Sequence, residues 1–249
     1  MKNSIFSSFQ RLKPLRMFVV SILTATVIMI NLIDPLIRAY RENSFVEGMH
    51  IDLLMKGIQS TAYSSFIPII SIVPFGGCYV DELKSKYARF ALIRSSYSTY
   101  IYSHIVVGFL SGSLVILTGS LMIWGAIAGM LIPIEQKIEG VEPYVIDGLI
   151  EIYVLLFVNG GLWSVVGMAM STFMESKYIA YASPFVIYYM LLILCERYFP
   201  DAYLLYPPNW TNPDVWPYGA WGAAIFLLEL TLVFSILFFI RAGRRLREL

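Results

Sequence analysis

Charge is scarce in this sequence. Only 14% of the 249 residues are Asp, Glu, Lys or Arg, whereas 58% are hydrophobic. Soluble domains carry about 25% charged residues, so an ordinary water-soluble globule is excluded. Disordered and coiled-coil classes are excluded as well, because they need a polar or heptad-periodic chain. The 18 basic and 17 acidic residues nearly cancel, so net charge indicates no nucleic-acid partner. The composition predicts an integral membrane protein.

Residues that carry catalysis or bind nucleotides are also rare. His50 and His104 are the only histidines, so an H-E-x-x-H zinc site cannot form, and no G-x-S-x-G elbow occurs. A P-loop needs a Gly-Lys pair, which the sequence lacks. We therefore expect a non-catalytic chain without a cofactor of its own. If the protein uses ATP, another polypeptide must hydrolyse it.

Cys78 and Cys195 are too few for a disulfide scaffold. The apolar runs place them near opposite membrane faces, about 30 Å apart. A disulfide needs Cα atoms within about 7 Å, so we expect both thiols to be free.

Six long apolar runs dominate the sequence. Backbone polar groups must bond internally in lipid, so each run is predicted to be a helix. We expect one all-α transmembrane domain over residues 1–249, with spans at residues 17–37, 57–80, 100–131, 148–170, 178–196 and 220–240. The third run is longer than one crossing needs, so it should tilt or project into water.

The basic residues predict an orientation. Thirteen of the 18 Lys and Arg lie before the first span, between spans two and three, between four and five, or after the sixth. The positive-inside rule then places both termini in the cytoplasm. Before the first span, Ile5, Phe6, Phe9 and Leu12 share one helical face, which favours an interfacial helix ended by Pro14. The alternative is a plain basic anchor.

The loop between spans two and three has a helical pattern. It opens on two acidic residues, which favour a helix N-terminus. Apolar and basic residues then recur at helical spacing: Leu83, Tyr87, Phe90, Ala91 and Arg94. We expect a short amphipathic helix in the cytoplasm, suited to contact with a soluble partner. The alternative is a solvated connector whose basic residues only set the topology.

Residues 74–101 begin Pro-Phe-Gly-Gly, continue through Asp81 into this basic helix, and end with an Arg-Ser-x-Tyr-like return to the membrane. This segment resembles the region between spans two and three of type-2 ABC exporter permeases from Gram-positive bacteria. The resemblance extends over nearly the whole chain: six spans, an N-terminal interfacial helix, a coupling helix, and short outer helices between spans five and six.

The resemblance implies a permease in the bacterial plasma membrane, paired with a second identical or homologous copy. It also implies separate ABC ATPase subunits that hold ATP and Mg. The ATPase-coupling residues would be Asp81, Glu82, Leu83, Tyr87, Phe90 and Arg94. The family transports antibiotics, lipids, polysaccharides, ions and peptides. Exporters of amphipathic peptide toxins are similar in size, so a hydrophobic or amphipathic cargo is expected.

Aromatic residues suggest where that cargo passes. Tyr63, Phe66 and Phe75 lie on the second span and Tyr181 and Tyr188 on the fifth, and we expect these spans to face each other across the dimer centre. The alternative is that the tyrosines form interfacial belts.

The loop after the fifth span, residues 198–221, alternates aromatic residues with prolines, which forbid one long helix. Short helices with Trp210 and Trp216 would then form an outer lid, or else an aromatic belt that anchors the last two spans.

Two features lie deep in the spans. Glu229 is an intramembrane carboxylate near the middle of the sixth span. It is either a neutral hydrogen-bonding group, which we favour, or a proton-coupling or cation-coupling site. The pairs Gly108-x-x-x-Gly112 and Gly125-x-x-x-Gly129 on the third span would allow close helix approach.

The leading hypothesis is the permease subunit of an ATP-driven exporter. The alternatives are an ion-gradient-driven carrier coupled through Glu229 and a non-transporting immunity or scaffold protein in the membrane.

Overall fold

The computed structural model describes residues 12–42, 45–136, 146–174 and 176–247. The predicted interfacial helix falls mostly on residues 1–11 and lies outside this part of the chain. The described residues form α-helices joined by turns and short 3₁₀ helices, with one isolated parallel bridge between Val46 and Gln136 and no strand. The all-α class predicted from the sequence is therefore confirmed.

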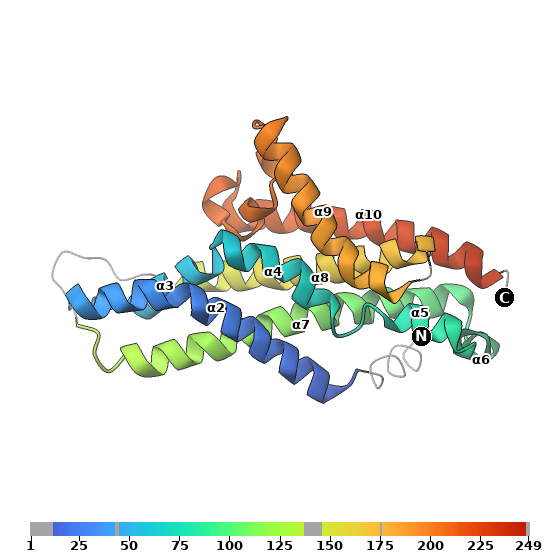
Figure 1. Ribbon diagram of the computed structural model, residues 1–249, viewed down its shortest axis with the longest axis horizontal. Coiled ribbons are helices and arrows are strands. Elements are labelled where there is room, and N and C mark those ends of the chain that lie inside the picture. The colour runs from blue at the N-terminus through green and yellow to red at the C-terminus, as the bar shows by residue number, and fades with distance from the viewer. Residues whose placement is uncertain (1–11, 43–44, 137–145, 175, 248–249) are drawn as a thin grey trace.

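Within the described residues, five helices are long and apolar enough to cross a membrane. They confirm a multi-pass membrane protein and are α2 (Pro14–Glu42), α7 (Tyr97–Leu131), α8 (Ile146–Met174), α9 (Lys177–Arg197) and α10 (Gly219–Arg247). The 35 residues of α7 reach about 52 Å at 1.5 Å per residue, well beyond the ~30 Å hydrocarbon core. Figure 1 shows α7 and α10 running along the long axis of the molecule, with α9 inclined away from it.

The predicted second span, residues 57–80, is not one helix. Instead, α3 (Met49–Ile58) ends at its start, α4 (Thr61–Ile72) follows, and a turn leads to α5 (Cys78–Lys84) and α6 (Tyr87–Arg94). The 12 residues of α4 cover about 18 Å, less than the hydrocarbon core. The Ser60 side chain caps the helix by accepting from the Tyr63 N–H at 3.2 Å. Six spans therefore remain a prediction.

Glycines bring α7 and α8 into close contact. A Cβ at Gly112 would lie 2.6 Å from the Gly160 carbonyl oxygen and 3.0 Å from that of Ser71 on α4. The predicted close approach at Gly108 and Gly112 is thus confirmed. At Gly125 and Gly129 a Cβ would meet nothing within 4 Å, so no close helix approach forms there among the described residues. The helix α8 forms the centre of the bundle, because 78% of an apolar stretch of 18 residues on it is buried inside the protein.

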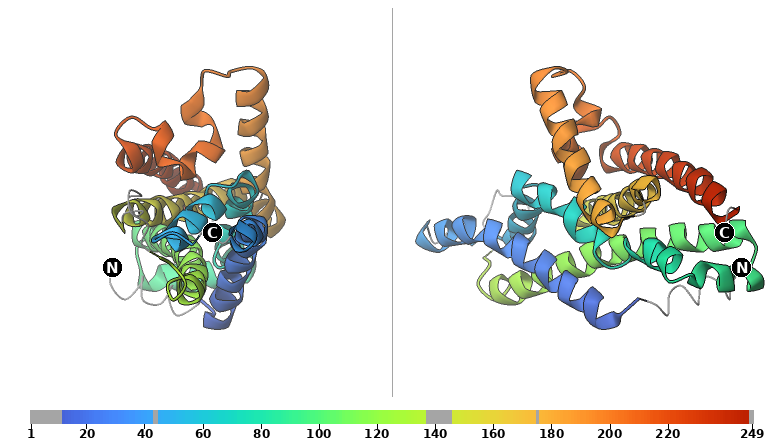
Figure 2. Two further views of the ribbon diagram at one scale, coloured as in Figure 1. Left: turned by 90° about the vertical axis from the view of Figure 1, so that its left-hand side faces the viewer. Right: turned by 45° about the vertical axis from the view of Figure 1, so that its right-hand side comes forward.

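The two ends of the bundle differ in character. Figures 1 and 2 show α5, α6 and the C-terminal end of α10 together at one end of the long axis. The helix α3 and the C-terminal end of α7 lie at the other end. We refer to them as the α6 end and the α3 end.

A buried carboxylate holds the α3 end together. The side chain of Glu135, just after α7, is 6% exposed and accepts the N–H groups of Gly48 and His50 at 3.0 and 2.9 Å. Its oxygen also lies 2.8 Å from His50 Nδ1. Burial acts to raise the pKa of Glu135, but these hydrogen bonds together lower it below its ordinary value. The carboxylate therefore caps α3 and ties it to α7.

Candidate functional site

An exposed apolar face marks the α6 end. Tyr87, Phe90 and Ile93 on α6 are 42%, 66% and 82% exposed, whereas Ala88 on the opposite face is buried. The exposed face expected at Tyr87 and Phe90 is therefore present, but the single helix expected from Asp81 to Arg94 is two helices, with Leu83 on α5 and not on this face. Lys86, between α5 and α6, adopts a left-handed conformation with φ 60°, which turns α6 away from α5. The Arg94 side chain lies outside the described part of the structure.

Glu82 points into the protein. Its side chain accepts a 2.5 Å hydrogen bond from the Tyr100 hydroxyl, and its other oxygen lies 3.4 Å from His104 Nε2. Glu82, Tyr100 and His104 are all buried, and the rings of Phe75 and Tyr79 pack around the imidazole. The carboxylate therefore joins α5 to α7 and is not displayed on the surface.

The remaining residues of α5 extend this connection. Asp81 is exposed and pairs with Lys177 at the start of α9. Leu83 is half-buried and packs against the apolar cluster at this end of the bundle. Hence the neighbouring residues Asp81 and Glu82 connect α5 to α9 and to α7, directly before the exposed face of α6.

The five residues predicted to line a pathway do not gather in one cavity. Tyr63, Phe75 and Tyr188 are fully buried inside the chain, where the Tyr188 hydroxyl lies 2.7 Å from that of Ser64. Phe66 is 43% exposed, and the hydroxyl of half-buried Tyr181 accepts a hydrogen bond from the Arg16 guanidinium. The helices α4 and α9 pack against each other within one chain.

An apolar cavity of about 360 Å³ lies between α8, α9 and α10. Figure 2 shows α9 and α10 diverging from each other beside α8. No charged side chain lines the cavity, and its walls are Leu162, Trp163, Val166, Met170, Ile187, Met190, Leu191, Leu205, Trp210, Leu230 and Phe234. Sequence reasoning identified only Trp210, because the other residues look like ordinary lipid-facing positions.

The segment between α9 and α10 folds onto this cavity. It forms the 3₁₀ helices η1 (Tyr203–Leu205), η2 (Pro207–Thr211) and η3 (Pro213–Val215), where short helices were expected. Trp210 is 2% exposed and donates its indole N–H to the Leu204 carbonyl at 2.9 Å. Its ring stacks on that of Trp163, with the ring centroids 5.5 Å apart. Trp216 is 7% exposed and donates to the Asn209 carbonyl at 2.8 Å.

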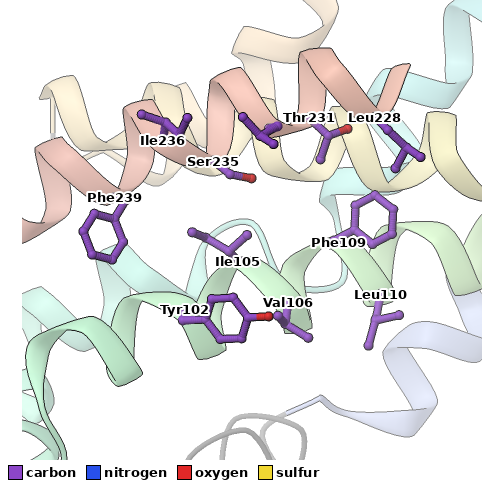
Figure 3. Close-up of a pocket in the computed structure, with 11 residues that line it drawn as sticks. Tyr102, Ile105, Val106, Phe109, Leu110, Leu228, Thr231, Ser235, Ile236 and Phe239 are labelled. Atoms are coloured by element: carbon purple, nitrogen blue, oxygen red, sulfur yellow. The ribbon is translucent and has the colours of Figure 1, made fainter. Parts of the chain in front are cut away.

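Glu229 faces out of the bundle from α10. Its side chain is exposed, and so are the apolar side chains around it, Ile225, Leu228, Leu232 and Val233. Beside this face, α7 and α10 enclose an apolar groove of about 480 Å³ (Figure 3). No group of three or more His, Cys, Asp or Glu that could hold a metal exists among the described residues. Both cysteines are free, as expected.

These features define a multi-pass helical membrane protein with an exposed apolar face at one end and an apolar cavity between its helices. No protein-family model, curated protein or solved structure matches the chain. The ABC exporter family therefore stays a prediction that rests on the residues named above.

Proposed function

We propose that this protein is the permease subunit of an ATP-driven ABC exporter in the bacterial plasma membrane, with both termini in the cytoplasm. The observation that carries the proposal is the apolar face of Tyr87, Phe90 and Ile93 at the α6 end. Complete burial of a fully exposed Phe or Ile side chain contributes about 1.5–3 kcal/mol, and a partner that covers the exposed parts of these three side chains would gain a corresponding fraction of that. A separate ATPase subunit, holding ATP and Mg, supplies that partner, and a second permease copy completes the transporter.

The helix α5 transmits motion from the ATPase to the spans. Because Glu82 is hydrogen-bonded to Tyr100 and Asp81 is paired with Lys177, a displacement of α6 would be felt at the starts of both α7 and α9. In this proposal Asp81 and Glu82 position the helix, and Tyr87 and Phe90 contact the ATPase.

The cargo is hydrophobic or amphipathic. The 360 Å³ cavity is within the usual range of about 300–1,000 Å³ for ligand sites, and its walls offer apolar and aromatic contact without charge. Trp210 closes one side of it, so the segment of η1–η3 acts as the outer lid. A cargo with an acyl chain or several apolar side chains fits this lining.

Photo-crosslinking in the native host tests the proposal. Benzoylphenylalanine replaces Phe90 or Ile93 in the full chain, and Val186, an exposed residue of α9, provides the matched control. We expect Phe90 and Ile93, but not Val186, to crosslink a protein that carries Walker motifs and binds azido-ATP. The Tyr87→Ala/Phe90→Ala variant should lose the crosslink from Ile93 and the ATP-dependent export.

Crosslinks from Phe90 and Ile93 to lipid alone would show that α6 lies on the membrane surface, which contradicts the proposal. Full export by the Tyr87→Ala/Phe90→Ala variant would contradict it as well.

A second candidate is an ion-gradient-driven carrier, favoured by the carboxylate of Glu229 at mid-span. It predicts that Glu229→Gln abolishes transport and its dependence on a proton gradient, whereas the exporter should tolerate this change. A non-transporting immunity or scaffold protein would show neither ATP-dependent nor gradient-dependent transport.

A further inference from the structure

Glu229 lies close to the middle of the membrane. About 20 residues separate Trp221 from Arg241 on α10, which corresponds to ~30 Å, the thickness of the hydrocarbon core. Glu229 is then ~12 Å below the level of Trp221. A charged side chain at this depth costs about 2.5–3.5 kcal/mol or more. No hydrogen bond or ion pair to Glu229 is formed by the part of the chain that the structure describes.

The surface around Glu229 is a continuous apolar ridge. Trp221, Ile225, Leu232 and Ile236 are 59%, 58%, 59% and 51% exposed and follow one another at helical spacing. Leu232 and Ile236 also form one wall of the groove between α7 and α10. Lipid tails would satisfy the apolar side chains of the ridge but not the carboxyl group. A protein surface with a hydrogen-bonding group at the same depth would satisfy both.

The groove beside the ridge offers such a group. Figure 3 shows Leu228, Thr231 and Ser235 of α10 facing a row of α7 side chains that includes Ile105 and Phe109. Thr231 is only 8% exposed, but its side chain lines the groove. Its hydroxyl donates to the Leu227 carbonyl at 2.7 Å, so its oxygen can still accept a hydrogen bond from a group that enters the groove. Thr231 is two residues from Glu229, so the two side chains differ in depth by only about 3 Å.

We propose that a second copy of this chain packs against α10, with the two-fold axis along the membrane normal. The ridge of each copy enters the groove of the other, where the protonated Glu229 carboxyl donates a hydrogen bond to the partner subunit's Thr231. Parallel two-fold packing brings residues of equal number to equal depth, so ridge and groove are in register. An isologous contact needs both halves on one chain, and this chain carries them side by side.

This interface differs from the one predicted from the sequence. That prediction placed spans two and five across the dimer centre, but α4 and α9 contact each other inside one chain. The inference requires only that α10 spans the membrane. It shares the second permease copy with the proposed function but does not involve the ATPase, so a dimer that forms through another face would overturn this interface and leave the exporter proposal standing.

The hydrogen bond is tested by measuring dimerisation of the full chain in liposomes. Single-molecule photobleaching counts the dimers as the protein is diluted in the lipid. Glu229→Gln retains a donor and should dimerise within about twofold of the natural chain. Glu229→Leu and Thr231→Val should each weaken the dimer about 3- to 10-fold, the range expected for one interhelical hydrogen bond. The double variant should be no weaker than the worse single one, because both changes remove the same bond.

Cysteine crosslinking locates the interface. In a background with Cys78 and Cys195 replaced by Ala, Leu232→Cys on α10 should crosslink between copies. Val186→Cys on α9 and Ile30→Cys on α2, which are equally exposed, should not. Crosslinking at Val186 or Ile30 alone, a monomeric chain, or undiminished dimerisation of Glu229→Leu would overturn the proposal.

Discussion

Replacement of Gly112 by Ala tests the packing of the bundle centre. The added methyl group would lie 2.6 Å from the Gly160 carbonyl oxygen, 2.7 Å from Ser164 Cβ and 3.0 Å from the Ser71 carbonyl oxygen. Two of these three atoms belong to backbone in α8 and α4, so a side-chain rotation cannot relieve the overlap. Overpacking of this kind destabilises a protein by about 1–3 kcal/mol.

Gly125 provides the matched control on the same helix. A methyl group there meets nothing within 4 Å, and both substitutions gain the same intrinsic helix propensity, up to about 1 kcal/mol. The difference between the two variants therefore isolates the overlap. At a mid-range ~2 kcal/mol it corresponds to roughly 4–8 °C in melting temperature for a chain of this size.

The assay is thermal unfolding of the purified chain in detergent and again in liposomes, with the natural chain, Gly112→Ala and Gly125→Ala side by side. Gly112→Ala should melt first and Gly125→Ala at or above the natural chain. Equal melting temperatures for the two variants would refute the close contact of α7 with α8 and α4.

Two further predictions concern buried polar groups at opposite ends of the bundle. Glu135→Gln should destabilise the chain by about 1–3 kcal/mol at neutral pH, because the amide replaces a charged acceptor. Since folding lowers the pKa of Glu135, its stabilisation is complete above the ordinary carboxyl pKa and is lost as the pH falls through the lowered folded value. The melting temperature of Glu135→Gln should therefore fall less steeply with decreasing pH than that of the natural chain. An equal fall in both proteins would contradict this linkage. Tyr100→Phe removes the hydroxyl bound to Glu82 and should cost a similar ~1–3 kcal/mol, whereas Tyr97→Phe at an exposed site should change stability by less than about 0.5 kcal/mol.

Apolar run length predicted most of the helices but not their ends. The run at residues 17–37 became a helix from Pro14 to Glu42, because a helix continues into water once its core turns are formed. The run at 57–80 failed for a different reason. Its composition resembles a span, but Pro74 and the glycines after it interrupt the helical geometry, and hydropathy does not register that interruption.

The candidate site, too, could be predicted from the sequence only in part. Helical periodicity predicted the exposed face of Tyr87 and Phe90, since periodicity directly encodes which residues share a face. It could not assign Glu82 to the interior, because its partner Tyr100 lies on α7, two helices and 18 residues further on. The sequence could not predict the cavity for a related reason. Its lining residues come from three separate helices, and they have the same chemistry as residues that face lipid.

The shortness of α4 has a consequence for how the chain enters the membrane. A segment of 12 residues is too short to partition stably into the bilayer by itself, and the helices that bury Tyr63 and Ile67 include α8 and α9, which are synthesised later. We therefore expect α4 to remain near the membrane surface during synthesis and to insert only after α7, α8 and α9 have packed together. The membrane topology would then be completed by insertion of α4, after α9 has been synthesised.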